Sequence, residues 1–456
     1  MTAIRTAMRL LYVLPEFPPD FGGGIATVYG QLLPRLAAAG HRITVLLASR
    51  ERLDQPGYLW QGVEVVPLQS AALVQGQQQM HAWRHHAFLN QFLPVAWAAW
   101  SQAQELGAFE VVEATDWALL FLPWLVQRRS QPVVVSLHGS CGQVDWHGNP
   151  ANRRGEGQLV RLLESSVLPL ADGVIANSNL NAEFWWQQCG VRPQVIPPQV
   201  GELTGSEVAP TPIGLSQRRP RSGRGVVVGR LQNWKGPEVL CTALRLLPGQ
   251  QVDWIGQDTD WEESTISTAA HLRRMFPDVV DYQLHLLGML PVKQVQSKIS
   301  EAAFLCVPSL WDVFNVTVLE AIAAGTPVIC SKHAGAAMLL AHGLTGYLFD
   351  PHHAEELVDA ISAVETLNAT EYNRLTARAK EQTAGLINTD QVASQHLALY
   401  RDSMDGFLFR GVSPWLCDAL NNGMEPISAN RLDQQGRPVY TLLRQGWRRF
   451  RGHSRV

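Results

Sequence analysis

Two acidic residues, Asp312 and Glu320, stand eight positions apart around a predicted junction between a loop and a helix. An ionised carboxylate only accepts hydrogen bonds, so it suits neighbouring hydroxyl groups such as those of a sugar. Glu320 is predicted to lie one to two turns inside the helix, where it can hold the hydroxyls of a ribose. Asp312 lies before the helix and can reach a second set of hydroxyls. The spacing favours a sugar-nucleotide site, and the alternative is a capped helix with two solvated acids.

The helix after this junction is predicted to run from Phe314 to Ala324. Gly325 and Pro327 stand where residues that terminate helices are expected. The first N–H groups of a helix have no internal partners and lie at the positive end of its dipole, so they favour a diphosphate. In this helix the groups are the N–H groups of Phe314, Asn315 and Val316.

Two cations, Arg230 and Lys235, follow the predicted strand 225–228 within one loop. Arginine offers a planar fork of donors and lysine a point charge, and both suit the oxygens of a diphosphate. Taken alone, the loop is better explained as a surface loop with ordinary salt bridges.

The loop from Gly229 to Gly236, taken together with the Asp312 to Glu320 segment, resembles the motifs of the retaining family 4 glycosyltransferases, also described as glycosyl transferases group 1. The resemblance spans roughly residues 10 to 400 and implies an α/β protein of the GT-B fold, with two facing Rossmann-like doubly wound parallel-sheet domains and a cleft between them. It implies that Arg230 and Lys235 bind the nucleotide diphosphate. It also implies that Asp312 touches the donor sugar, that the amides of residues 314–316 bind the donor phosphate and that Glu320 holds the ribose.

Three further segments match the family by position. The Gly22-Gly23-Gly24 run permits close approach of backbone to a phosphate or sugar, and by resemblance Gly23 and Gly24 face the donor phosphate and the acceptor. His138 follows a predicted strand, where the family has a histidine that contacts the donor sugar, although a lone histidine is more often structural. Met289 stands where the family presents backbone groups to the base.

The expected activity is transfer of a sugar from a nucleotide-diphosphate sugar to a hydroxyl of a sugar, a lipid-linked molecule or a small molecule, with retention of anomeric configuration. The resemblance implies a metal-independent enzyme, so we expect no metal and no cofactor, the sugar nucleotide being a substrate. Asp312 stands where the family has glutamate, and Pro198 and Met338 also depart from its pattern. The rival hypotheses are a sugar-nucleotide epimerase of the same fold and a catalytically silent scaffold that binds a partner.

Length and composition agree with a two-domain globular protein. The chain has 456 residues, of which 46% are hydrophobic and 17% charged. The net charge of −3 gives no general attraction to nucleic acid. The six scattered cysteines are typical of reduced thiols, which predicts a cytoplasmic protein. The predicted divisions are an acceptor-side domain at 1–200, a linker at 201–224, a nucleotide-sugar-binding domain at 225–390, and a helix with a basic tail at 391–456.

The tail from Arg437 to Arg455 carries several arginines and no acid, with Trp447 and Phe450 near helical spacing. A basic amphipathic helix with aromatic anchors can lie on an anionic membrane, so we expect weak, salt-sensitive attachment to its inner face. The alternatives are a helix packed on the first domain and a disordered basic end. Sedimentation with anionic liposomes at low salt should remove more of the full chain than of a chain ending at Gly436, and equal recovery in the supernatant would exclude attachment.

Overall fold

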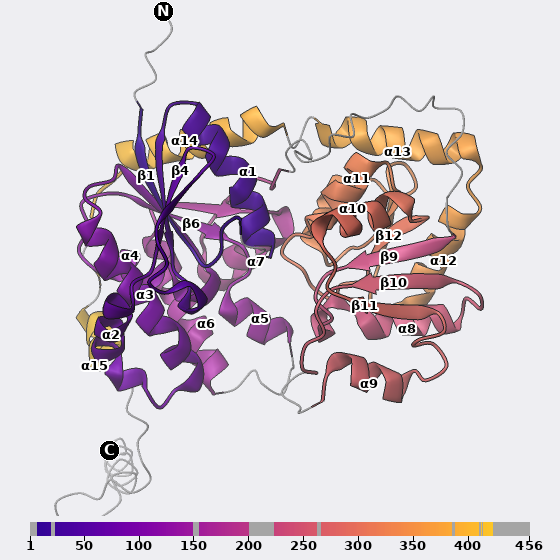
Figure 1. Cartoon of the computed structure of the whole chain (residues 1–456), viewed down its shortest axis with the longest axis horizontal. Helices are drawn as coiled ribbons and strands as arrows, with labels where there is room; N and C mark the ends of the chain where they lie inside the picture. Colours follow the sequence, from indigo (N-terminus) through magenta and orange to yellow (C-terminus); the bar gives the residue numbers. More distant parts are fainter. Residues whose placement is uncertain are drawn as a thin grey trace, which may run out of the picture.

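The computed structural model describes residues 7–19, 23–148, 155–199, 223–261, 266–384, 388–409, 412 and 414–422. These residues form two α/β domains, each built on one sheet (Figure 1). The predicted linker at 201–224 and the basic tail lie almost wholly outside the described residues, so the membrane contact stays a prediction.

The first domain has an eight-stranded sheet of order β3-β4-β2-β1-β5-β6-β7-β8, parallel except for the β3–β4 pair. Its buried strands are near-continuous apolar runs, as expected for a parallel sheet covered by helices on both faces. In chain order its elements are β1 Arg9–Leu14, α1 Gly24–Ala38, β2 Arg42–Leu47, β3 Tyr58–Trp60, β4 Val63–Pro67, α2 Ser70–Gln79, α3 Ala87–Glu105, β5 Val111–Thr115, α4 Leu122–Val126, β6 Val133–Leu137, α5 Cys141–His147, α6 Glu156–Val167, β7 Gly173–Ala176, α7 Asn179–Cys189 and β8 Gln194–Val195.

The second domain has a six-stranded parallel sheet of order β11-β10-β9-β12-β13-β14. Its elements are β9 Arg224–Val228, α8 Pro237–Arg245, β10 Gln251–Ile255, α9 Thr268–Met275, β11 Leu284–Gly288, α10 Val292–Glu301, β12 Phe304–Val307, α11 Thr317–Ala324, β13 Val328–Ser331, β14 Tyr347–Phe349, α12 Ala354–Glu365 and α13 Ala369–Ala384. The short strands β3 and β14 were not predicted from the sequence.

Each sheet has a hydrophobic core on both faces, because successive side chains of a strand point to opposite sides. Along β1, Leu11 and Val13 join one buried cluster, whereas Leu10 and Tyr12 join the other. The parallel register places the carboxyl ends of the strands at one edge of each sheet, where loops can carry functional groups.

The last two described helices return to the first domain. After α13 has packed on the second domain, α14 Thr389–Asp405 runs along the first domain beside α1 (Figure 1). The final helix, α15 Pro414–Asn422, also packs there, and the carbonyl oxygen of Leu420 accepts a hydrogen bond from the indole of Trp83 at 2.8 Å. None of the described helices combines the length and the apolarity that a membrane crossing requires.

Candidate active site

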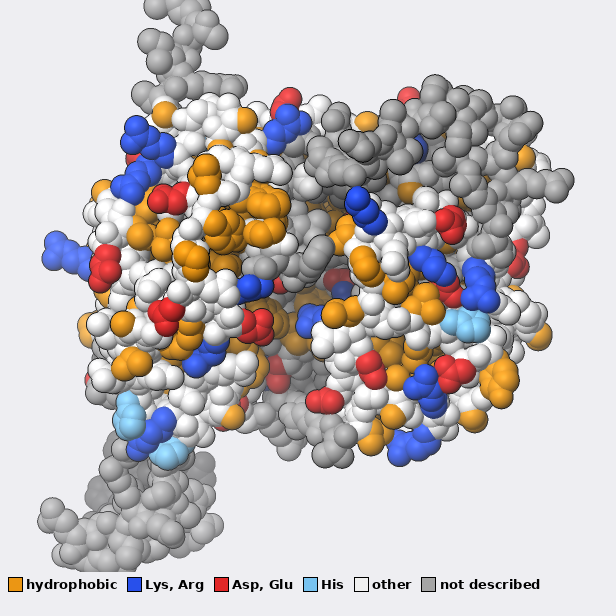
Figure 2. Space-filling view, viewed as in Figure 1, with side chains coloured by type: hydrophobic (Ala, Val, Ile, Leu, Met, Phe, Trp, Pro, Cys, Tyr) orange, Lys and Arg blue, Asp and Glu red, His pale blue; other side chains and the backbone are white. Residues whose placement is uncertain are grey.

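The two domains meet where a loop of the second domain touches strand ends of the first. Ser178, just before α7, donates a hydrogen bond from its hydroxyl to the carbonyl oxygen of Val313 at 2.8 Å. A Cβ atom on Gly335 would lie 1.9 Å from that same oxygen, so only glycine fits there. Gly139, just after β6, also faces the side chain of Val313. The loop that carries Asp312 is therefore held against the carboxyl ends of β6 and β7, and the surface is hollowed between the two domains (Figure 2).

Lys235 and Asp312, which the sequence analysis placed in separate motifs, form an ion pair. The ammonium nitrogen of Lys235 lies 2.6 Å from Oδ2 of Asp312. Asp312 is buried and Lys235 half-buried, so the pair is shielded from water. Gly236 makes this approach possible: it has a φ of +73°, and a Cβ atom there would lie 1.9 Å from the carbonyl oxygen of Pro308. The loops after β9 and β12 thus pack backbone to backbone.

The prediction that the next helix begins at Phe314 is wrong, because α11 begins at Thr317. Oδ1 of Asn315 accepts hydrogen bonds from the N–H of Thr317, at 3.2 Å, and from the Thr317 hydroxyl. A short amide side chain that bonds to the main chain two residues on offers the backbone an alternative to the helix. The N–H groups of Phe314, Asn315 and Val316 therefore precede the helix. Among the described residues no hydrogen-bond partner is found for these three groups.

Glu320 lies in the first turn of α11, closer to the helix start than predicted. Its carboxylate is half-buried, and this burial raises its pKa. Within the part of the chain that the structure describes, no hydrogen bond or ion pair to the carboxylate is found. A partly desolvated carboxylate gains more from a hydroxyl donor than an exposed one does.

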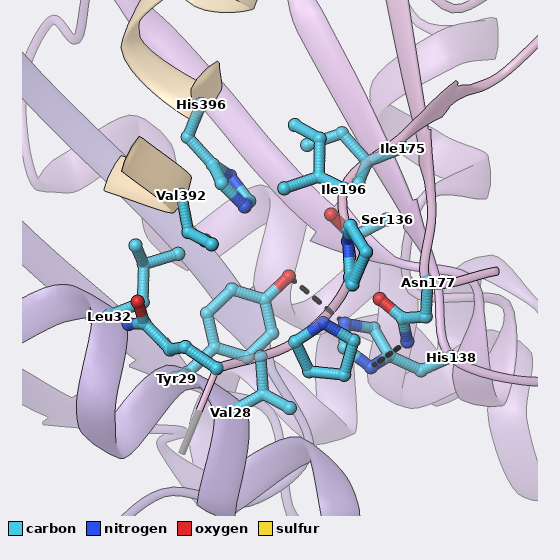
Figure 3. Close-up of a pocket in the computed structure, with 13 residues that line it drawn as sticks. Val28, Tyr29, Leu32, Ser136, His138, Ile175, Asn177, Ile196, Val392 and His396 are labelled. Carbon is cyan, nitrogen blue, oxygen red and sulfur yellow. Dashed lines mark hydrogen bonds between the residues drawn. The ribbon is translucent and has the colours of Figure 1, made fainter. Parts of the chain in front are cut away.

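His138 follows β6 and is held by three residues of the first domain, two of which, Tyr29 and Asn177, are drawn in Figure 3. Its backbone N–H donates to Asp116 at 2.8 Å, its Nδ1 lies 3.2 Å from the amide nitrogen of Asn177, and its Nε2 lies 3.3 Å from the hydroxyl of Tyr29. Burial lowers the pKa of His138 to about 4, so the ring is neutral at pH 7. Because an amide nitrogen only donates, Nδ1 is an acceptor and the ring proton resides on Nε2.

A small pocket of about 10 Å³ lies beside His138, with room for about one water molecule (Figure 3). Pro198 and Gln199, which replace the residues expected from the family pattern, line it together with Tyr29. Helix α14 closes it with His396. The departure at Pro198 is therefore adjacent to a predicted site residue.

A buried carboxylate behind His138 was not singled out from the sequence. Glu113 accepts hydrogen bonds from the hydroxyls of Tyr29, Ser136 and Tyr400, and Nδ1 of His396 lies 3.7 Å away. Burial alone would raise the pKa of Glu113, but His396 and the tyrosine hydroxyls outweigh it and lower the pKa to about 2. The sequence feature that could have indicated this residue is the position of Glu113 as a single acid within the apolar strand β5. Through Glu113, the network connects α14 to Tyr29, which contacts His138.

We expect Glu113→Gln to lower the free energy of unfolding at pH 7 by on the order of 3 kcal/mol. The folded pKa, about 2, lies below the ordinary value of 4.5. The ionised carboxylate therefore contributes stability that is fully present above pH 4.5 and is lost as the pH falls toward 2. Urea denaturation measures the free energy of unfolding of parent and variant. The difference between the two proteins should become smaller as the pH falls over this range.

The matched control for that experiment is Glu64→Gln, which alters an exposed carboxylate on β4. We expect it to change stability by less than about 0.5 kcal/mol at either pH. Equal effects of the two substitutions would contradict the stabilising role of Glu113.

The glycine loop has a different arrangement from the one its motif suggests. The carboxylate of Glu16 accepts hydrogen bonds from the N–H groups of Gly23, at 2.7 Å, and Ala26, at 3.0 Å. A side chain thus occupies the anion position at the start of α1, which begins at Gly24. A donor phosphate at this position would have to displace Glu16. Gly22 lies outside the described residues.

Two predicted site residues stand apart from the Lys235–Asp312 pair. Arg230 is exposed, and among the described residues no hydrogen bond or ion pair to its side chain is found. Met289 is 73% exposed. The structure therefore places Asp312 in contact with Lys235, at 2.6 Å, and with the side-chain amide of Asn315, at 3.4 Å. His138 lies on the other side of the domain junction, next to Gly139, which faces Val313. Among the described residues, no hydrogen bond or ion pair joins the side chain of Arg230 or Met289 to this group.

The two halves of the chain match two family models. The model described as Glycosyltransferase Family 4 matches residues 22–200, and the model described as Glycosyl transferases group 1 matches residues 222–382. The chain belongs to these glycosyltransferases. The D-inositol 3-phosphate glycosyltransferase of Mycolicibacterium smegmatis is 24% identical to this glycosyltransferase over 438 residues, which are 91% of this chain and 94% of that protein.

Solved structures show the same fold. Sucrose-phosphate synthase from Thermosynechococcus elongatus has a TM-score of 0.68 and 20% identity to this glycosyltransferase, covering 88% of the chain and all of that structure. Anabaena HepE, solved in complex with UDP-glucose, has a TM-score of 0.57 and 17% identity, with coverage of 88% and 100%. The expectation of two Rossmann-like domains in a GT-B arrangement is confirmed.

Proposed function

We propose that this glycosyltransferase moves a hexosyl group from a nucleotide-diphosphate sugar to an acceptor hydroxyl with retention of anomeric configuration. The observation that carries the proposal is the shielded Lys235–Asp312 pair, 2.6 Å long, in the loops that the first domain contacts. A cation fixed beside a carboxylate at a domain junction suits a substrate with an anionic leaving group and a hydroxyl-rich sugar.

In the proposed reaction the bond between the anomeric carbon and the diphosphate oxygen breaks, and a bond to the acceptor oxygen forms on the same face. The acceptor proton passes to the departing diphosphate. Negative charge grows on the diphosphate as the bond breaks, so fixed donors near it stabilise the transition state. Lys235, Arg230 and the N–H groups of residues 314–316 fill this role. When the diphosphate leaves water, these donors take the place of its water contacts, and the protein holds them in position before the reaction.

The remaining site residues bind the other parts of the donor. Asp312 and the neutral His138 hold the sugar hydroxyls, and Glu320 holds the ribose. The 3.3 Å contact from Nε2 of His138 to Tyr29 is long, so a sugar hydroxyl can replace it at small cost. Main-chain groups around Met289 face the base, and Gly23 and Gly24 face the donor phosphate and the acceptor once Glu16 is displaced.

The nature of the donor is supported by HepE, whose structure holds UDP-glucose. We therefore rank UDP-sugars first. The relatives named above act on different acceptors, according to their names, so a sugar, a lipid-linked molecule and a small molecule all stay open.

The test is incubation of the protein with UDP-, ADP- and GDP-sugars, with and without sugar, inositol and lipid-linked acceptors. Mass spectrometry should detect release of a nucleoside diphosphate, and the anomeric proton coupling of the product should show retention. A changed sugar without release would indicate an epimerase. No change with any donor would favour a silent scaffold, and either result overturns the proposal.

A further inference from the structure

Two histidines and an aspartate gather at the edge of the second sheet, in a group that the proposed transfer reaction does not use. The side chains are those of His333, Asp350 and His352, and one ligand atom from each lies within 4.8 Å of the others. The rings of His333 and His352 meet edge to face, with centroids 5.2 Å apart. Eighteen residues lie between the two histidines in sequence, so no short spacing motif indicates them.

The sheet brings these residues together. Strands β13 and β14 are parallel neighbours, with Ser331 paired to Phe349 at their carboxyl ends. His333 follows the first of these residues by two positions, and Asp350 directly follows the second. The cluster therefore rests on adjacent strand ends, which fix the positions of its ligands better than a free loop does.

Local hydrogen bonds orient the carboxylate. Oδ1 of Asp350 accepts from the backbone N–H of His352 at 2.9 Å, and the backbone N–H of Asp350 donates to Glu356 at 2.9 Å. Supporting bonds of this kind around ligands are typical of metal sites.

We propose that His333, Asp350 and His352 bind a divalent transition-metal ion of the Zn²⁺ class. Two imidazoles and one carboxylate suit zinc, whereas Mg²⁺ and Ca²⁺ prefer sites made of oxygen ligands alone. His353, whose Nδ1 lies 3.7 Å from Oδ2 of Asp350, is a candidate fourth ligand. Without it, water completes a tetrahedral shell.

A metal here would act as a clamp on the segment that is hydrogen-bonded to Asp312. The carbonyl oxygen of His333 accepts from the N–H of Asp312 at 3.2 Å, and Gly335 donates to the carbonyl oxygen of Asp312 at 2.9 Å. Binding would join this segment to the end of β14. The inference concerns binding alone and stands whether or not the transfer reaction is correct.

The experiment uses the full chain without a histidine tag, treated with EDTA and dialysed. Calorimetry with Zn²⁺ should show one site per chain, and Mg²⁺ under the same conditions should give no comparable heat. Zn²⁺ should also raise the melting temperature of the parent, because a ligand that binds only the folded state stabilises it.

The deciding variant is His352→Ala, since this side chain is exposed and its loss should not disturb folding. We expect at least a tenfold loss of Zn²⁺ affinity, and the same for His333→Ala. His85→Ala, which removes an exposed histidine of the first domain, is the matched control and should bind as the parent does. Absence of Zn²⁺ binding, or equal binding by the His352→Ala and His85→Ala proteins, would overturn the proposal.

Discussion

Turnover of the Lys235→Ala protein is expected to fall by on the order of hundredfold or more. The lysine contacts the buried Asp312 at 2.6 Å, so its charge is held where a leaving diphosphate can use it. We expect a similar loss for Arg230→Ala. Because Arg230 is exposed, that substitution should leave the fold intact. Steady-state release of nucleoside diphosphate, measured for both variants at saturating donor, checks the prediction.

A control is needed because Lys235→Ala also leaves a buried carboxylate without its cation. Lys298→Ala removes one of the two cations that pair with a buried carboxylate elsewhere: Lys298 lies 2.8 Å from the buried Asp253. Asp253 also pairs with Arg224, at the opposite end of the sheet from the candidate site. This variant should retain turnover within a few-fold of the parent. Comparable turnover of all three variants and the parent would refute the role of the two cations.

The second large effect separates the two acids. Glu320→Gln should weaken binding of free nucleoside diphosphate about tenfold or more, since a hydrogen bond to a charged group contributes roughly 1.5–3 kcal/mol. Asp312→Ala should leave that binding nearly unchanged and abolish most of the transfer, because in the proposed complex Asp312 contacts the sugar and not the nucleotide. Calorimetry with the nucleoside diphosphate and rate measurements with the donor give the two readings.

The same calorimetric and rate measurements can also contradict the roles assigned to Glu320 and Asp312. Loss of nucleotide affinity in Asp312→Ala, together with normal affinity in Glu320→Gln, would exchange the two roles. The substitution Asp312→Ala also removes the ion-pair partner of Lys235. A freed cation attracts the diphosphate more strongly, so any change in affinity for that variant should be a gain.

The sequence predicted what depends on local pattern. The apolar strands 133–137 and 225–228 and the helix near 391–404 were located within two residues, because periodicity and buried runs are local properties. Strand β14, only three residues long, was too short to give such a pattern. The error at the start of α11 came from the Asn315 side chain, which competes with the helical hydrogen bonds.

Contacts between residues far apart in the chain could not be predicted from the sequence. Lys235 and Asp312 were each chosen for their chemistry, but their ion pair spans 77 residues and depends on the close approach at Gly236. The hydrogen bond from Tyr400 to Glu113 spans 287 residues. Such pairs follow from how elements pack in three dimensions, which periodicity along one chain does not encode.

The return of α14 to the first domain means that the chain crosses between the two domains twice. A single connection would allow the domains to twist about it freely, whereas two connections limit relative motion to rotation about an axis near both. The second crossing ends in a helix anchored by Tyr400 and His396 on the buried Glu113. Any opening or closing of the domains around a substrate would therefore be restricted to this rotation. The second connection is attached at Glu113, behind the histidine that faces the donor sugar in the proposed reaction.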